Sequence, residues 1–118
     1  MSTILALRLA AVLGFLAVAL GAFGAHGLKE LLTRLDTLAI WEKAVFYHMI
    51  HAVVLLFLAS RVPFPTVAYL LFFAGILVFS GSLYILAFTG IKWLGAITPI
   101  GGLCLLGGWL TLAIATPK

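Results

Sequence analysis

The chain has 118 residues, 65% of them hydrophobic and 8% charged, with a formal net charge of +4. A soluble domain normally carries about 25% charged residues, so this composition excludes a soluble globular protein and makes the lipid bilayer the expected partner. The seven lysines and arginines stand singly along the chain. Because they form no basic patch, we expect no nucleic-acid partner.

Four long stretches that are almost free of charge divide the chain. Crossing a bilayer as a helix takes roughly 20 mainly apolar residues. The stretches predict four spans, at about residues 4–25, 41–60, 66–89 and 93–116. Strands are excluded because so short a chain could not close a barrel. We therefore expect an all-α membrane protein with a single transmembrane domain over residues 1–118, folded as a four-transmembrane-helix bundle.

A short amphipathic helix is predicted between the first two spans, at about residues 28–37. Leu28, Leu31, Leu32 and Leu35 recur there at helical spacing, and the charged residues largely take the opposite side. Such a helix is typical of the plane of the membrane interface. A helix packed on the ends of the spans is the alternative.

The second span opens with the stretch around which we expect the bundle to be organised. In a helix, His48 and His51 lie one turn apart on a shared face, and Tyr47 lies one turn before His51. Ionisable side chains inside a membrane point at neighbouring helices and away from lipid. We therefore predict that both histidines face the interior of the bundle.

The last two spans carry further packing signals. Ala68, Gly75, Ser82 and Thr89 recur seven residues apart in the third span. Because small residues let helix backbones approach closely in lipid, we expect Ala68, Gly75 and Ser82 at a helix–helix contact. Pro99 lies inside the fourth span and should kink it, because proline removes a backbone hydrogen bond.

Two sets of residues are candidates for a role inside the membrane. The first is a predicted intramembrane polar cluster, made of His26, Tyr47, His48, His51, Ser80, Ser82, Tyr84 and Thr98. The second set is predicted to determine helix packing and comprises Gly14, Gly21, Gly24, Gly75, Gly81, Pro99, Gly101, Gly102 and Gly108. For the small residues of the first span, packing within the chain is the simpler interpretation and a dimer interface is the alternative.

The positive residues leave the orientation in the membrane open. With four spans both termini share one side, which holds three of the seven positive residues, Arg8, Arg61 and Lys118. The other side holds the remaining four, Lys29, Arg34, Lys43 and Lys92. A difference of one residue favours a cytoplasmic loop between the first two spans only slightly.

Several segments together resemble a known family. They are GAFGAHGL at residues 21–28, Trp41 with Ala44, Tyr47, His48 and His51, FSGSLY at 79–84, ITPIGG at 97–102, and Gly108 with Trp109. This combination resembles the small inner-membrane proteins of the YgdD type, an uncharacterised family with distant eukaryotic relatives. The resemblance implies a multi-pass protein of the bacterial inner (plasma) membrane. It implies no established activity, substrate or cofactor.

Three hypotheses for the function follow from the polar cluster. A hydrogen-bonded core that fixes helix register favours a membrane scaffold or an accessory subunit of a larger membrane complex. The alternative is a small oligomeric transporter, or a protein that handles protons or ions through His48 and His51, since histidine titrates near neutral pH. Four short helices leave little room for a pore in one chain, so this alternative needs a homo-oligomer.

Metal or haem binding by His48 and His51 is the least favoured hypothesis, because no cluster of Cys, Asp or Glu accompanies them. The sequence offers no paired carboxylates, no nucleophile with an obvious base and no phosphate-binding loop. We therefore expect no enzymatic activity, no metal and no cofactor. The expected protein partners are further copies of this chain or a larger membrane complex.

Overall fold

The computed structural model describes residues 1–115, and all regular structure in that range is helical. The elements in chain order are α1 (Thr3–Ala25), α2 (Lys29–Arg34), α3 (Leu38–Ala59), α4 (Thr66–Gly75), the π-helical η1 (Ile76–Ser80), α5 (Gly81–Thr89), the 3₁₀-helical η2 (Lys92–Ala96) and α6 (Thr98–Ile114). The expected end of the fourth span at Thr116 and the lysine counted at position 118 lie outside the described residues.

Four stretches of the described chain are long and apolar enough to cross a membrane: Thr3–Ala25, Leu38–Ala59, Thr66–Thr89 and Lys92–Ile114. The prediction of an all-α fold with four spans is thereby confirmed. The second of these stretches begins three residues before the predicted boundary at Trp41. The short helix α2 is shorter than the predicted range of residues 28–37.

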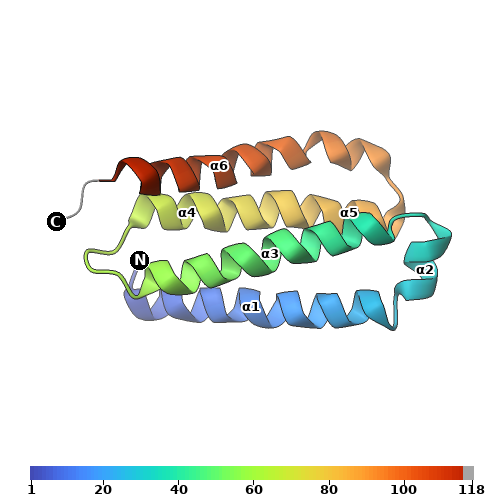
Figure 1. The fold of residues 1–118 in the computed structure, drawn as a ribbon, viewed down its shortest axis with the longest axis horizontal. Coiled ribbons are helices and arrows are strands. Elements are labelled where there is room, and N and C mark those ends of the chain that lie inside the picture. The colour runs from blue at the N-terminus through green and yellow to red at the C-terminus, as the bar shows by residue number, and fades with distance from the viewer. Residues whose placement is uncertain (116–118) are drawn as a thin grey trace.

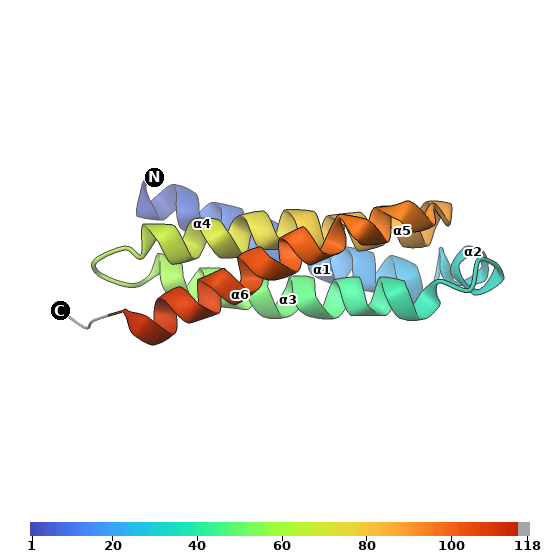
Figure 2. The ribbon, with the colours of Figure 1, turned by 90° about the horizontal axis from the view of Figure 1, so that it is seen from above.

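In Figure 1 the long helices lie side by side, with α3 and the α4–η1–α5 rod between α1 and α6, and Figure 2 shows α6 crossing the others at an angle. The first helix, α1, packs on α3, and α6 packs on α4 and η1. As a result α1 and α6 lie at opposite edges of the molecule (Figure 1). Within an apolar window of 18 residues, 39% and 44% of the residues are buried in the two central spans, against 22% and 17% in the two edge spans. The edge helices therefore present most of their surface outward.

The loop between α1 and α3 is anchored to the end of the bundle. Leu32 of α2 is fully buried and packs in one cluster with Trp41 and Ala87. In Figure 1, α2 lies across the ends of the long helices. This arrangement agrees with the alternative interpretation of α2, a helix packed on the ends of the spans.

A single π-helical turn interrupts the third span, where the sequence predicted a regular helix. It covers Ile76–Ser80 and is flanked by Gly75 and Gly81. Ala68, Gly75 and Ser82, the three residues predicted at a helix–helix contact, are buried as expected, and the row ends at the exposed Thr89. Such π-turns change the direction in which the following side chains point.

The predicted kink at Pro99 is wrong. Lys92–Ala96 forms a 3₁₀-helix, and the α-helix begins only at Thr98, with the proline in its first turn. In that position the missing proline N–H costs nothing, because the first N–H groups of a helix have no partner within the helix. Pro99 is also exposed, so it makes no packing contact of the predicted kind.

The other predicted packing residues divide into two groups. A methyl group added at Gly24 would overlap the Trp41 indole, and one added at Gly101 would overlap the Phe79 backbone. Further close contacts occur at Gly21, Gly75 and Gly108, and an ordinary one at Gly102. The prediction is wrong for Gly14 and Gly81, where an added methyl group would have no neighbour within 4 Å.

Candidate functional site

Two buried histidines lie on successive turns of α3, near the middle of the bundle. His48 is 3% exposed and His51 is 5% exposed. The prediction that both face the interior is therefore confirmed. They nevertheless face different neighbours, because His48 contacts α5 and His51 contacts α6.

Both ring nitrogens of His51 have hydrogen-bond partners. Its Nδ1 lies 2.7 Å from the carbonyl oxygen of Tyr47, and the indole Nε1–H of Trp109 donates to its Nε2 at 3.1 Å. A carbonyl only accepts and an indole N–H only donates, so the network assigns the proton to Nδ1 and leaves Nε2 as an acceptor. In this arrangement His51 is a neutral imidazole that links α3 to α6. Binding a metal or a second proton there would first break one of these bonds.

Aromatic rings surround His51 on both helices. The centroid of its ring lies 5.6 Å from that of Phe72 and 5.9 Å from that of Trp109. Phe72 and Trp109 in turn meet edge to face at 5.2 Å. The close approach depends on Gly108, where an added Cβ would come within 2.8 Å of the Phe72 ring. The glycine thus lets α6 bring its tryptophan to the histidine.

His48 has only one of its two nitrogens paired. Its Nδ1 lies 2.8 Å from the phenol oxygen of Tyr84 on α5. The Leu13 carbonyl of α1 faces the ring, but the buried Nε2 has no hydrogen-bond partner within residues 1–115. Tyr84 also packs edge to face against Trp41 at 4.9 Å. An unpaired buried polar atom costs about 1–3 kcal/mol, and Nε2 of His48 is the ring nitrogen of this pair that carries such a cost within residues 1–115.

The remaining members of the predicted polar cluster lie in separate places. Ser82 and Thr98 share a hydrogen bond of 2.6 Å between their hydroxyl oxygens, which links α5 to α6. Ser80 donates to the carbonyl oxygen of Ala44 at 2.8 Å, linking η1 to α3. His26 is exposed at the C-terminal end of α1 and does not join the buried histidines.

The ring of Tyr47 stacks on the ring of His51, with centroids 6.2 Å apart. It is 38% exposed and packs against Phe79, with ring centroids 4.7 Å apart. Its polar contribution to the site is its backbone carbonyl, which accepts from His51.

Sequence reasoning missed four residues that join helices by donating hydrogen bonds. Trp109 donates to His51. The other three donate to carbonyl oxygens of neighbouring helices: Thr37 to Ala87 at 2.7 Å, Trp41 to Leu20 at 2.9 Å and Tyr69 to Ala6 at 2.5 Å. Each carries one N–H or O–H donor in an apolar surrounding, where an unpaired donor is costly. That chemical feature is visible in the sequence, but the carbonyl acceptors are not.

The surroundings of His51 contain a small lateral cavity but no cluster of metal ligands. The cavity has a volume of about 330 Å³, and its lining of Tyr47, His51, Phe79, Gly102, Leu105, Leu106 and Trp109 is mostly apolar. Within residues 1–115, no three His, Cys, Asp or Glu residues lie close enough together to hold a metal ion.

The fold and the paired polar side chains define a small, multi-pass, all-helical membrane protein. More narrowly, the chain belongs to the family described as "Protein of unknown function (DUF423)", which matches residues 20–102. It is 48% identical over 115 residues to a UPF0382 membrane protein of Staphylococcus epidermidis, with 93% of each chain covered. It is 47% identical over 116 residues to the UPF0382 membrane protein YwdK of Bacillus subtilis, covering 93% of this chain and 94% of the relative.

A third relative, the UPF0382 membrane protein SSP2132 of Staphylococcus saprophyticus, is 49% identical over 115 residues and is matched over 94% of its length. No solved structure matches the chain. The chain is therefore a multi-pass bacterial membrane protein of a family whose activity is not assigned.

Proposed function

We propose that this protein is a membrane scaffold or an accessory subunit of a larger membrane complex. The observation that carries this proposal is the pairing of His51, whose two nitrogens are both held within the bundle by Tyr47 and Trp109. A group bound on both sides fixes the register of two helices and is not free to exchange ligands. We also propose that this chain is of the YgdD type.

The hydroxyl groups of the spans support the same function. Ser80, Tyr69 and Thr37 each donate to a backbone carbonyl of another helix. Their polar atoms are thus used to join helices and do not line a path for a solute. The outward faces of α1 and α6, the two edge helices, are among the exposed apolar surfaces left for interaction.

Native mass spectrometry of the protein, extracted gently from its own membrane, tests this proposal. We expect the chain to be found with a polypeptide of different mass. Leu103 of α6 is 68% exposed and Leu7 of α1 is 49% exposed, so Leu103→Trp and Leu7→Trp each block one edge helix. One of the two variants should release the partner. A wild-type chain found only alone, or only as multiples of itself, would refute the accessory role.

A second candidate function, proton handling, is favoured by one observation, the unpaired Nε2 of His48. Intramembrane ionisable groups often mark proton paths. The test is proton flux into liposomes that contain the purified protein, followed with a pH-sensitive dye trapped inside. His48→Gln should abolish the flux, whereas His26→Gln, at an exposed position, should leave it unchanged. Flux equal to that of protein-free liposomes would dismiss this candidate.

A further inference from the structure

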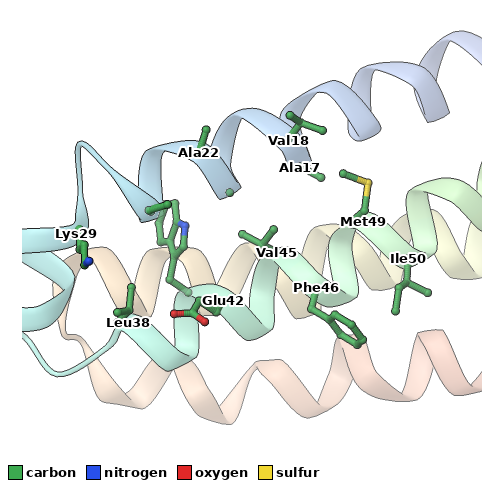
Figure 3. A pocket seen from close by; sticks show the side chains of 14 residues that line it. Ala17, Val18, Ala22, Lys29, Leu38, Glu42, Val45, Phe46, Met49 and Ile50 are labelled. Carbon is green, nitrogen blue, oxygen red and sulfur yellow. The ribbon is translucent and has the colours of Figure 1, made fainter.

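A groove of about 740 Å³ runs between α1 and α3, near the end of the bundle that carries α2 (Figure 3). Val18 and Phe46, which line it, are each 61% exposed. The groove therefore opens sideways, toward the surroundings of the bundle. Its volume falls within the range of roughly 300–1,000 Å³ that is typical of small-molecule sites.

The groove is polar at one end only. Lys29 of α2 and Glu42 of α3 both line it, and both side chains are exposed. In Figure 3 these two residues lie at the end nearest α2, with Leu38 between them, and Val45 and Met49 lie farther along the groove. One end thus offers a positive and a negative charge, and the remainder offers apolar surface.

The length of the groove matches one leaflet of a bilayer. Its lining on α3 extends from Leu38 to Ile50, which is about 18 Å at about 1.5 Å per residue. Its lining on α1 extends from Ala17 to Ala25, about 12 Å on the same scale. Half of a hydrocarbon core of about 30 Å is about 15 Å. A single acyl chain that begins at the charged end would therefore run along the length of the groove.

We propose that this groove is a binding site for one phospholipid with a phosphoethanolamine headgroup. The headgroup phosphate accepts hydrogen bonds from the Lys29 ammonium group, and the headgroup ammonium donates to the Glu42 carboxylate. Hydrogen bonds between charged groups are stronger than neutral ones. An acyl chain lies along Val45 and Met49. An anionic headgroup without an amine gains only the lysine contact and is repelled by Glu42.

Native mass spectrometry of the full-length protein tests this site. The purified chain is mixed with equal amounts of phosphatidylethanolamine and phosphatidylglycerol that carry the same acyl chains. We expect the wild type to retain mainly phosphatidylethanolamine. Glu42→Gln should lower that preference about three- to fivefold, since an exposed ion pair contributes up to ~1 kcal/mol and 1.4 kcal/mol corresponds to tenfold. Glu30→Gln, at an exposed position in α2 outside the groove lining, should leave the preference unchanged.

A second pair of variants tests the apolar part of the groove. Ala22 lines the groove, whereas Ala11 is exposed on the same helix outside the lining. Ala22→Leu should lower the retention of both lipids severalfold, and Ala11→Leu should not. Neither change enters the buried core, so both variants should fold.

Four outcomes would overturn the proposal. They are the absence of retained lipid on the wild type, an unchanged lipid preference in Glu42→Gln, equal retention by the Ala22→Leu and Ala11→Leu variants, and a dimer lost specifically in Ala22→Leu. The last outcome would assign the groove to a second copy of the chain. All of these measurements use the purified chain without a partner, so they stand apart from the test of the accessory role.

Discussion

Replacing Gly101 by alanine should separate α6 from the π-helical turn. The added Cβ would lie 2.7 Å from the Cα of Phe79 and 2.9 Å from its Cβ. Both atoms belong to or adjoin the backbone, so they cannot move aside as the end of a flexible side chain can. Inserting a methyl group into a packed site typically costs about 1–3 kcal/mol, and we expect a loss of that size at this position before any gain in helix propensity.

Gly14→Ala provides the matched control for this experiment. An alanine there would have no neighbour within 4 Å of its Cβ, although Gly14 also lies within a long helix. Both substitutions gain the same helix propensity, about 0.8–1.0 kcal/mol for glycine to alanine. The difference between the two variants therefore isolates the steric cost.

The assay for the pair is the free energy of unfolding, measured by denaturant titration in one detergent. We expect Gly101→Ala to be less stable than Gly14→Ala by about 1–3 kcal/mol, with the wild type between them. Equal stability of the two variants would show that α6 does not approach Phe79 as closely as the structure indicates. That result would also contradict the close packing of α6 against η1 seen in the structure.

Three further predictions concern the buried hydrogen bonds, each measured as the unfolding free energy in detergent. His51→Leu should destabilise the protein by about 1–3 kcal/mol, because it removes the hydrogen bonds of a buried side chain and leaves the Trp109 N–H without its acceptor. His26→Leu, at an exposed position, should change the stability little, and equal losses would contradict the buried network. Trp109→Phe removes one donor and should cost about 0.6 kcal/mol and at most about 1.7 kcal/mol, the mean and the maximum for hydrogen bonds between transmembrane helices. An unchanged stability would show that this bond is not formed. Tyr69→Phe should cost a similar amount because its phenol donates to the Ala6 carbonyl; a more stable variant would refute that reasoning.

The fold could be predicted from the sequence because the bilayer leaves few alternatives. Few charges and four long apolar stretches require helices, since each backbone N–H must be paired within its own segment. The start of the last α-helix at Thr98 could not be predicted from the sequence in the same way. A proline in an apolar stretch indicates a kink or a helix start equally well, and only the preceding 3₁₀-helix Lys92–Ala96 decides between them.

The packing residues were predictable in type but not in position. Glycine has no side chain and so allows a neighbouring helix to come close wherever it occurs. A contact forms only where a residue of that neighbouring helix reaches the glycine. Gly24 has that neighbour in Trp41, and Gly14 has none within 4 Å. The difference depends on where α3 lies against α1, which no pattern within α1 encodes.

The division of the polar cluster has a geometric origin. Three residues of a helix with 3.6 residues per turn advance by about 300°, so His48 and His51 diverge by about 60° although they share a face. In a bundle whose neighbouring helix axes are about 8–10 Å apart, this divergence directs the two rings to different partners. His48 accordingly meets Tyr84 on α5, and His51 meets Trp109 on α6. The spacing of three residues, which suggested a single site in the sequence, therefore produces two separate contacts in the fold. Only His48 is left with an unpaired ring nitrogen.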